Sequence, residues 1–165
     1  CPLDRNDEPQ STLLLSPPGY GKTTLLREWV RYFSDRGFTA AIADERSEIA
    51  ALADGVPQLA VGRCTDVMEG CSKWQAAVML LKTMSPALLA LDEITAPEDA
   101  KAVSLCTHCG TAVIACAHAA GLDDLRQRPI YRELLALGAF HQAVIIEKQD
   151  GQRVYRMERW EETKC

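Results

Sequence analysis

The sequence predicts an α/β fold in which a mostly parallel β-sheet is flanked by helices and followed by a C-terminal β-hairpin. Short apolar runs alternate with segments of helical periodicity, which is the pattern of a parallel sheet with crossover helices. The runs at 38–43, 87–91 and 111–116 are apolar without alternation, as expected for strands buried on both faces. Polar residues follow directly after these runs, at the edge where open α/β sheets bind ligands.

The predicted elements follow in a regular order. Residues 12–15 form an apolar run before a turn, and residues 21–36 carry apolar side chains at helical spacing. We expect a short helix over 48–53 and irregular structure over the glycine-containing segment 58–70. Further helices are expected at 72–84, 97–106 and 129–137. At the C-terminal end, 142–148 and 153–159 flank Asp150-Gly151, a dipeptide typical of hairpin turns.

Length and composition indicate one domain. The chain has 165 residues, of which 47% are hydrophobic, which is enough for a core without disulfides or metals. Residues 1–11 are mostly polar and contain two prolines, so we expect a linker there and the domain over 12–165. Because the first strand begins so early, we expect the domain to be part of a longer protein.

The charge and the cysteines exclude some classes of protein. The net charge of -5 argues against a domain built mainly to grip nucleic acid, which is usually basic. No apolar run approaches the ~20 residues of a membrane-spanning helix, so we expect any work at a membrane to occur from its surface. The odd number of cysteines, seven, is unusual for a secreted disulfide scaffold, and we expect a cytoplasmic protein.

The strongest motif is SPPGYGKT at residues 16–23, which matches the P-loop pattern G-x-x-x-x-G-K-S/T with serine in place of the first glycine. The glycines allow backbone N–H groups to turn toward phosphate oxygens, and the following helix presents its positive end. We expect Lys22 to reach the terminal phosphates of ATP and the Thr23 hydroxyl to coordinate Mg²⁺. Tyr20 is expected beside the nucleotide or exposed in the loop. The predicted ATP-binding residues are Ser16, Pro17, Pro18, Gly19, Tyr20, Gly21, Lys22, Thr23 and Thr24.

A second motif, LLALDE at residues 88–93, ends a predicted buried strand. Beside a P-loop, such a strand places an aspartate where it can hold Mg²⁺ through water, and we assign this role to Asp92. Glu93 follows directly and can orient and deprotonate the attacking water. A small-molecule kinase needs no such base, so Glu93 favours hydrolysis over transfer of the phosphoryl group.

Three acids lie in the segment DERSE at residues 44–48, after the predicted strand that follows the P-loop helix. Asp44, Glu45 and Glu48 could approach the Mg²⁺ ion and the γ-phosphate from the other side. The alternative is a solvated helix start with Ser47 as its cap. His118 follows the third buried strand and could sense the γ-phosphate, and its alternative is a structural role.

Zinc ligation is a further possibility at four side chains: Cys106, Cys109, Cys116 and His118. Structural zinc sites normally use two such pairs on loops. Here Cys116 falls within an apolar strand and Cys109 near a helix end, so we expect no zinc. Cys64 and Cys71 are expected to be buried thiols.

Several segments are more specific than a P-loop pattern. They are SPPGYGKTTLLR at 16–27, DERSEIA at 44–50, TDVMEGCSK at 65–73, Met84-Ser85-Pro86, Leu91-Asp92-Glu93-Ile94, Ala117-His118, Arg128-Pro129 and Arg132-Glu133-Leu134-Leu135. In these segments the chain resembles the ATPase domain of the stage III sporulation protein AA family, from Thr12 to about Arg159. Ser16 fits this resemblance, because the family's loop begins Ser-Pro-Pro-Gly.

That family is itself similar to the traffic ATPases of bacterial secretion systems, which carry an acidic box between the nucleotide motifs and a histidine box after them. The resemblance implies that segment 44–48 and Ala117-His118 occupy these places. It implies a P-loop NTPase of the RecA/AAA-like kind that uses ATP and Mg²⁺ and forms a ring, a hexamer in the full-length protein. It also implies a place at the cytosolic face of a membrane during endospore formation, where the ring energises a channel with membrane proteins of the stage III complex. We expect the family's N-terminal domain to lie outside residues 1–165.

Three features depart from the family's pattern, and one of them is the segment 61–65 with its unusual Cys64. Cys116 stands where threonine is usual before Ala-His, and Lys82 stands where arginine is usual. Lysine cannot make the bidentate phosphate contact of an arginine. Two alternatives to a secretion-type motor stay open: a RecA-like DNA translocase, and a non-hydrolysing nucleotide switch that organises a membrane complex.

A P-loop site also needs positive charge opposite the loop, often from an arginine supplied in trans. Arg63 is the first candidate, because its irregular, glycine-containing segment could reach outward. Arg46, Arg126 and Arg128 are the next candidates, and an ordinary surface role is the alternative for each.

Overall fold

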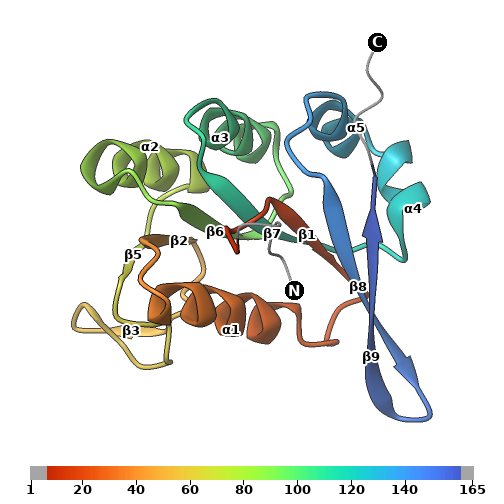
Figure 1. Ribbon diagram of the computed structural model, residues 1–165, viewed down its shortest axis with the longest axis horizontal. Coiled ribbons are helices and arrows are strands. Elements are labelled where there is room, and N and C mark those ends of the chain that lie inside the picture. The colour runs from red at the N-terminus through yellow and green to blue at the C-terminus, as the bar shows by residue number, and fades with distance from the viewer. Residues whose placement is uncertain (1–6, 161–165) are drawn as a thin grey trace.

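A computed structural model describes residues 7–160 of the chain. Its elements are β1 (Thr12–Leu15), α1 (Lys22–Asp35), β2 (Ala40–Asp44), β3 (Leu52–Ala53), β4 (Val56–Pro57), β5 (Thr65–Glu69), α2 (Lys73–Met84), β6 (Leu88–Glu93), α3 (Pro97–His108), β7 (Ala112–Ala117), α4 (Leu122–Gln127), α5 (Pro129–Ala136), β8 (Gln142–Gln149) and β9 (Gln152–Arg159). They form three layers, with α1 on one face of the large sheet and α2, α3 and α5 on the other (Figure 1).

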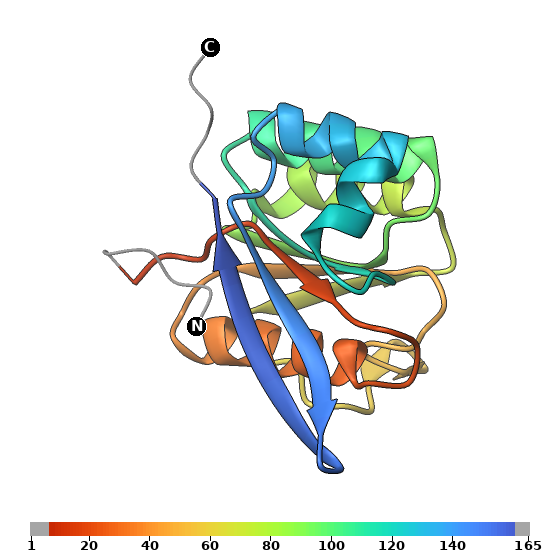
Figure 2. The same ribbon diagram turned by 90° about the vertical axis from the view of Figure 1, so that its right-hand side faces the viewer.

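The large sheet has seven strands in the order β5-β2-β6-β7-β1-β8-β9. Neighbouring strands run parallel except β8 and β9, which form an antiparallel hairpin. In Figure 2 this hairpin crosses in front of α1 and extends beyond it. The carboxyl ends of the parallel strands share one edge of the sheet, so the loop after β1 emerges beside the ends of its neighbours. The predicted α/β class with a C-terminal hairpin is confirmed.

Alternate residues of the central strands enter two hydrophobic cores. Leu89 and Leu91 of β6 pack in the core beneath α2, α3 and α5, whereas Leu88 and Ala90 pack in the core beneath α1. All four side chains are fully buried. Burial on both faces explains why the strands read as continuous apolar runs.

The main helices agree with the prediction to within two residues at each end. The start of α2 is the most tightly defined of them. The Ser72 hydroxyl accepts a hydrogen bond from the N–H of Gln75, and the Gln75 side chain accepts one from the N–H of Ser72, each at 3.3 Å. This capping box fixes Lys73 as the first residue of the helix.

The prediction of a short helix over 48–53 is wrong. The Asp44 carboxylate accepts hydrogen bonds of 2.8–3.1 Å from the backbone N–H groups of residues 48–50. These bonds hold the segment in a turn, because a side-chain acceptor competes with the helix for the same donors. Ala51 then adopts a φ of 50°, and the chain enters the two-stranded hairpin β3–β4.

The prediction of irregular structure over 58–70 is wrong for the second half of the segment, which forms the edge strand β5. This strand pairs with β2 on one side only and is half exposed, so it carries no continuous apolar run. Helix α4 was not predicted from the sequence. It has six residues, of which only Leu122 and Leu125 are buried.

The structure describes the two ends of the chain only in part. The linker predicted over 1–11 and the last residues of the predicted domain, 161–165, lie partly or wholly outside the described residues. Just before β1, the Ser11 hydroxyl accepts a hydrogen bond of 3.0 Å from the N–H of Val113, which holds the chain against β7. No helix between residues 7 and 160 has the length and apolar character of a membrane span.

The turn before β5 packs tightly against the end of α1. The Ser34 hydroxyl accepts a hydrogen bond of 2.7 Å from the N–H of Cys64. Gly62 has a φ of 94°, and a Cβ atom on it would lie 2.4 Å from the Cβ of Ser34. Ser34 is almost fully buried, so it has no room to move away.

We therefore expect Gly62→Ala to lower the free energy of unfolding by about 2–4 kcal/mol, combining the cost of a positive φ with that of overpacking. Gly55→Ala is the matched control, because Gly55 has a φ of 76° but open space around it. The control should lose only about 1 kcal/mol. Urea unfolding measures both, and equal losses would contradict the packing argument.

Candidate nucleotide site

The loop between β1 and α1 has the backbone shape of an anion-binding loop. Gly19 has a φ of 77° and Gly21 a φ of 88°, values that residues with a Cβ atom rarely adopt. Gly21 caps α1, and its carbonyl accepts the first helical hydrogen bond, 3.0 Å from the N–H of Leu25. The N–H groups of the first helical turn have no acceptor within a helix, so they are available to phosphate oxygens.

Lys22 lies inside this loop and is 7% exposed. Its ammonium group donates to the carbonyl of Ser16 at 2.9 Å, to the hydroxyl of Ser16 at 3.1 Å and to the carbonyl of Pro17 at 3.1 Å. Burial lowers the pKa of Lys22, and the nearby Cys116 and Glu93 oppose that shift. The serine at the first loop position therefore supplies two of the three acceptors that orient the lysine.

Asp92 lies at an irregularity in the sheet. The pairing of β6 with β7 shifts between Leu91 and Glu93, so Asp92 is the extra residue of a β-bulge. Bulges commonly re-aim a side chain beside an active site. Asp92 is 8% exposed, and its Oδ1 atom accepts no well-directed hydrogen bond. Burial raises the pKa of this carboxyl, and the charge of Lys73 acts in the opposite direction.

Lys73 is a site residue that the sequence analysis missed. Its side chain is 4% exposed, and its ammonium group lies 2.6 Å from Glu45 Oε2, 3.1 Å from Asp92 Oδ1 and 3.7 Å from Asp99 Oδ2. Burial lowers the pKa of Lys73, but the contacts with Glu45 and Asp92 outweigh this and raise it. No pattern in a single sequence marks such a lysine, because its partners come from distant segments.

Glu93 and His118 form a second pair at the same edge. His118 Nδ1 lies 2.7 Å from Glu93 Oε1, which gives the histidine a carboxylate partner. The chain after Glu93 is held by Tyr131, whose buried hydroxyl donates a hydrogen bond of 2.7 Å to the carbonyl of Ile94. The two sequence-predicted residues, Glu93 and His118, are thus brought together.

The three acids of segment 44–48 make different contacts. Asp44 is fully buried and binds the backbone of the following turn, as described above. Glu45 reaches the site through Lys73. Glu48 is exposed, and its carbonyl accepts a hydrogen bond of 3.1 Å from Arg27. Ser47 caps no helix, and its hydroxyl instead contacts Glu69.

Arg63 lies far from the phosphate loop of its own chain. It is exposed in the turn before β5, beside the end of α1, whereas the loop precedes the start of α1. The helix has 14 residues, which corresponds to about 21 Å. Arg63 is therefore outside the site that Lys22 and Asp92 define within one chain.

The hairpin β8–β9 brings two further cations to the loop. The Lys148 ammonium lies 4.8 Å from the ring centroid of Tyr20. The guanidinium of Arg153 lies so close to Gly21 that a Cβ atom there would be 2.9 Å from it. Lys148 and Arg153 are opposite each other in the hairpin. Sequence reasoning found the hairpin but not its proximity to the loop, which follows from its twist across α1 (Figure 2).

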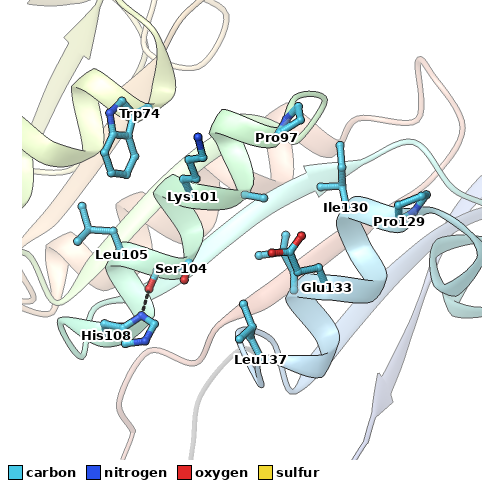
Figure 3. Close-up of a pocket in the computed structure, with 12 residues that line it drawn as sticks. Trp74, Pro97, Lys101, Ser104, Leu105, His108, Pro129, Ile130, Glu133 and Leu137 are labelled. Carbon is cyan, nitrogen blue, oxygen red and sulfur yellow. Dashed lines mark hydrogen bonds between the residues drawn. The ribbon is translucent and has the colours of Figure 1, made fainter.

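An apolar groove of about 600 Å³ lies on the sheet face opposite α1. It runs between α3 and α5, with Trp74 of α2 beside it (Figure 3). Leu105 and Ile130 line it together with the charged Lys101 and Glu133. None of these side chains belongs to the candidate catalytic set.

The residues at the sheet edge fit a bound Mg²⁺ ion. Between residues 7 and 160, no group of three His, Cys, Asp or Glu side chains is arranged to hold a metal alone. Mg²⁺ usually takes one or two protein ligands and completes its shell with water and phosphate oxygens. The carboxylate of Asp92, whose Oδ1 atom accepts no well-directed hydrogen bond, and the hydroxyl of Thr23 in the first turn of α1 could supply those protein ligands.

These features define the class of protein. A glycine loop between a buried strand and a helix, a lysine inside the loop, and an acidic strand end beside it are the features of a P-loop NTPase fold. The chain belongs to the family described as Sporulation stage III, protein AA, whose model matches residues 2–157. The resemblance drawn from the sequence is thereby confirmed.

One relative and two solved structures illustrate the likeness. Stage III sporulation protein AA of Bacillus subtilis (strain 168) is 36% identical over 146 residues, covering 86% of this chain and 48% of that protein. The VirB11 ATPase of the Brucella suis type IV secretion system, solved in complex with sulphate, gives a TM-score of 0.63 at 15% identity over 91% of this chain and 48% of that one. The pilus retraction motor PilT with bound ADP gives a TM-score of 0.64 at 15% identity, covering 94% and 48%. The last two show the fold alone.

The described cysteines are free thiols with different surroundings. Cys106 and Cys116 are buried, and burial raises the pKa of each thiol to about 12. Cys64 and Cys109 are exposed, so the expectation of a buried Cys64 is wrong. Its place in the surface turn before the edge strand β5 explains the exposure.

We expect iodoacetamide at pH 8 to alkylate Cys64 and Cys109 in the folded protein and to spare Cys106 and Cys116. A thiol with a pKa of about 12 has roughly one part in 10⁴ as reactive thiolate at that pH, and burial blocks access. Peptide mass spectrometry measures the labelling, with urea-unfolded protein as the control in which all thiols react. Equal labelling of Cys116 and Cys64 in the folded protein would contradict the packing of β7.

Proposed function

We propose that this domain binds ATP together with Mg²⁺ and hydrolyses the ATP to ADP and phosphate. One observation carries the proposal: a buried lysine inside a glycine loop lies at the same sheet edge as a bulged, buried aspartate whose Oδ1 atom accepts no well-directed hydrogen bond. Phosphoryl transfer depends mainly on positioning and charge stabilisation. The ATPases with the same fold support the proposal.

In this proposal Lys22 and the loop N–H groups hold the terminal phosphates, while Thr23 and Asp92 hold Mg²⁺, the latter through water. Bound Mg²⁺ neutralises phosphate charge. Glu93 accepts a proton from the attacking water while the oxygen of that water bonds to the γ-phosphorus. The bond from that phosphorus to the bridging oxygen breaks, and ADP leaves. His118, 2.7 Å from Glu93, holds the carboxylate in place and responds to the γ-phosphate.

We further propose a cellular role for the full-length protein. It acts as a ring-forming motor, a hexamer, at the cytosolic face of a membrane and energises a sporulation channel with stage III membrane proteins. Membership of a sporulation family supports this, as do two solved structures of the same fold, the ATPase of a type IV secretion system and a pilus retraction motor. The chain spans less than half of its Bacillus subtilis relative, so assembly belongs to the whole protein. The acidic net charge favours protein partners over direct contact with nucleic acid.

The alternative to an ATPase is a nucleotide switch that binds ATP without hydrolysing it. A variant of Glu93 distinguishes the two, because it tests hydrolysis separately from binding. We expect Glu93→Gln to bind ATP with unchanged affinity and to hydrolyse it ~100-fold more slowly, because shape is kept and the base is lost. Calorimetry measures the binding, and phosphate release measures the turnover. Lys22→Ala is the contrasting variant and should weaken binding roughly 10- to 100-fold, since it removes charge-assisted contacts.

Three outcomes would count against this assignment. Unchanged ATP affinity in Lys22→Ala refutes the phosphate-binding loop. Unchanged turnover in Glu93→Gln means that another acid is the base, and Glu45 or Glu48 is then examined first. Binding without any turnover in the wild-type full-length protein would favour the switch.

We also propose that Arg63 completes the site of a neighbouring subunit. Its distance from the loop of its own chain supports action in trans over action in cis. We expect Arg63→Ala to bind ATP normally but to lower hydrolysis by the assembled full-length ring, because arginines supplied in trans contribute ~10³–10⁵ to the rate. Mixing it with Lys22→Ala subunits should restore part of the activity. No recovery in demonstrably mixed rings would exclude Arg63 and direct attention to Arg46, Arg126 and Arg128.

A further inference from the structure

Lys73 is the most fully enclosed cation of the candidate site. Its side chain is 4% exposed, compared with 41% for Glu45 and 11% for Asp92. The capping box at Ser72 fixes the start of α2. It therefore also fixes the backbone position of Lys73, the first residue of that helix. The lysine is therefore held at the centre of the acids rather than reaching in from the surface.

The three carboxylates around this ammonium group come from three different connections. Glu45 follows β2, Asp92 lies in the bulge of β6, and Asp99 lies in the first turn of α3. Asp99 already accepts hydrogen bonds from the N–H groups of Thr95 and Ala96, at 2.8 and 3.0 Å, so it serves mainly as a cap of α3. Glu45 and Asp92 are the acids free to serve the nucleotide edge.

The ammonium group occupies the place where a cation shared by these acids would lie. It is 2.6 Å from one oxygen of Glu45 and 3.1 Å from Oδ1 of Asp92. Because the contact with Asp92 lacks the direction of a hydrogen bond, it orients the carboxylate mainly through charge. Without the lysine, three negative charges would face one another in a partly dry space. The three side chains are not arranged as a metal site as they stand, but carboxylate oxygens are the ligands that divalent cations prefer, so a cation could take the place of the ammonium group.

We propose that Lys73 is a positioning residue: it holds Glu45 and Asp92 toward the phosphate loop and prevents them from binding a divalent cation before a nucleotide arrives. Only the nucleotide step of this inference rests on the proposed function. Mg²⁺ then enters with ATP, whose phosphates supply most of its ligands, and Asp92 is already aimed at it. Lys73 itself touches neither the phosphates nor the attacking water.

The test measures Mn²⁺ binding without nucleotide, because Mn²⁺ takes the same oxygen ligands as Mg²⁺ and its free form is visible by electron paramagnetic resonance. We expect Lys73→Met to bind Mn²⁺ at least 10-fold more tightly than the wild-type protein. Lys73→Arg keeps the charge and should stay near the wild-type affinity. Lys101→Met, an exposed lysine of α3, is the matched control and should change nothing.

A second readout separates positioning from a general structural role. With MgATP, we expect Lys73→Met to lower kcat at least 10-fold and to change KM less than threefold, because Lys22 still holds the phosphates. If Lys73→Met does not fold, the double variant Lys73→Met/Asp99→Asn carries the same test, since it removes one negative charge together with the positive one. Thermal melting curves establish folding in each case.

The outcomes are distinct. A folded Lys73→Met protein, or the folded double variant, whose nucleotide-free Mn²⁺ affinity equals that of the wild type overturns the inference. So does tight Mn²⁺ binding by the wild-type protein itself. If the wild type neither binds nor hydrolyses MgATP, the proposed function fails, whereas the Mn²⁺ measurement without nucleotide still decides what Lys73 does.

Discussion

The parallel pairing of β7 with both β1 and β6 is the constraint on which the rest of the site depends. It sets Leu15, the last residue before the phosphate loop, opposite Ala117, and it sets Glu93 opposite Cys116. Three chain segments far apart in sequence are thereby brought to one edge of the sheet. A shift of one residue in this pairing would turn every buried strand side chain to the other core, so the site and the two cores depend on the same register.

Buried charge is concentrated at that edge and is compensated within it. Lys22, Lys73, Asp92 and Asp99 are buried there, and each lysine has close oxygen partners. Breaking a buried pair costs far more than the pair contributes, because one charge is left without a partner. The edge therefore has little tolerance for single changes, and we infer that its stability and its chemistry are coupled.

Much of this could be read from the sequence, because the signals are local. The P-loop, the apolar strands and the Asp150-Gly151 hairpin depend on neighbouring residues, and each lies where it was expected. The misses depend on distant partners. Asp44 redirects the segment after β2 through its carboxylate, β5 is an edge strand without an apolar pattern, and Lys73 acquires its meaning only when three connections meet around it. Spacing cannot reveal contacts of this kind.

The two open edges of the sheet bear on how copies of this protein can meet. The outermost strand β9 carries Arg153, Arg156, Glu158 and Arg159, and the opposite outermost strand β5 carries Asp66 and Glu69. Charged side chains on an edge strand discourage a second chain from adding its own strand there. Extension of the sheet from molecule to molecule is thus disfavoured at both ends. A chain that lost these charges would gain a route to fibrous aggregation, which competes with any ordered assembly that uses other surfaces.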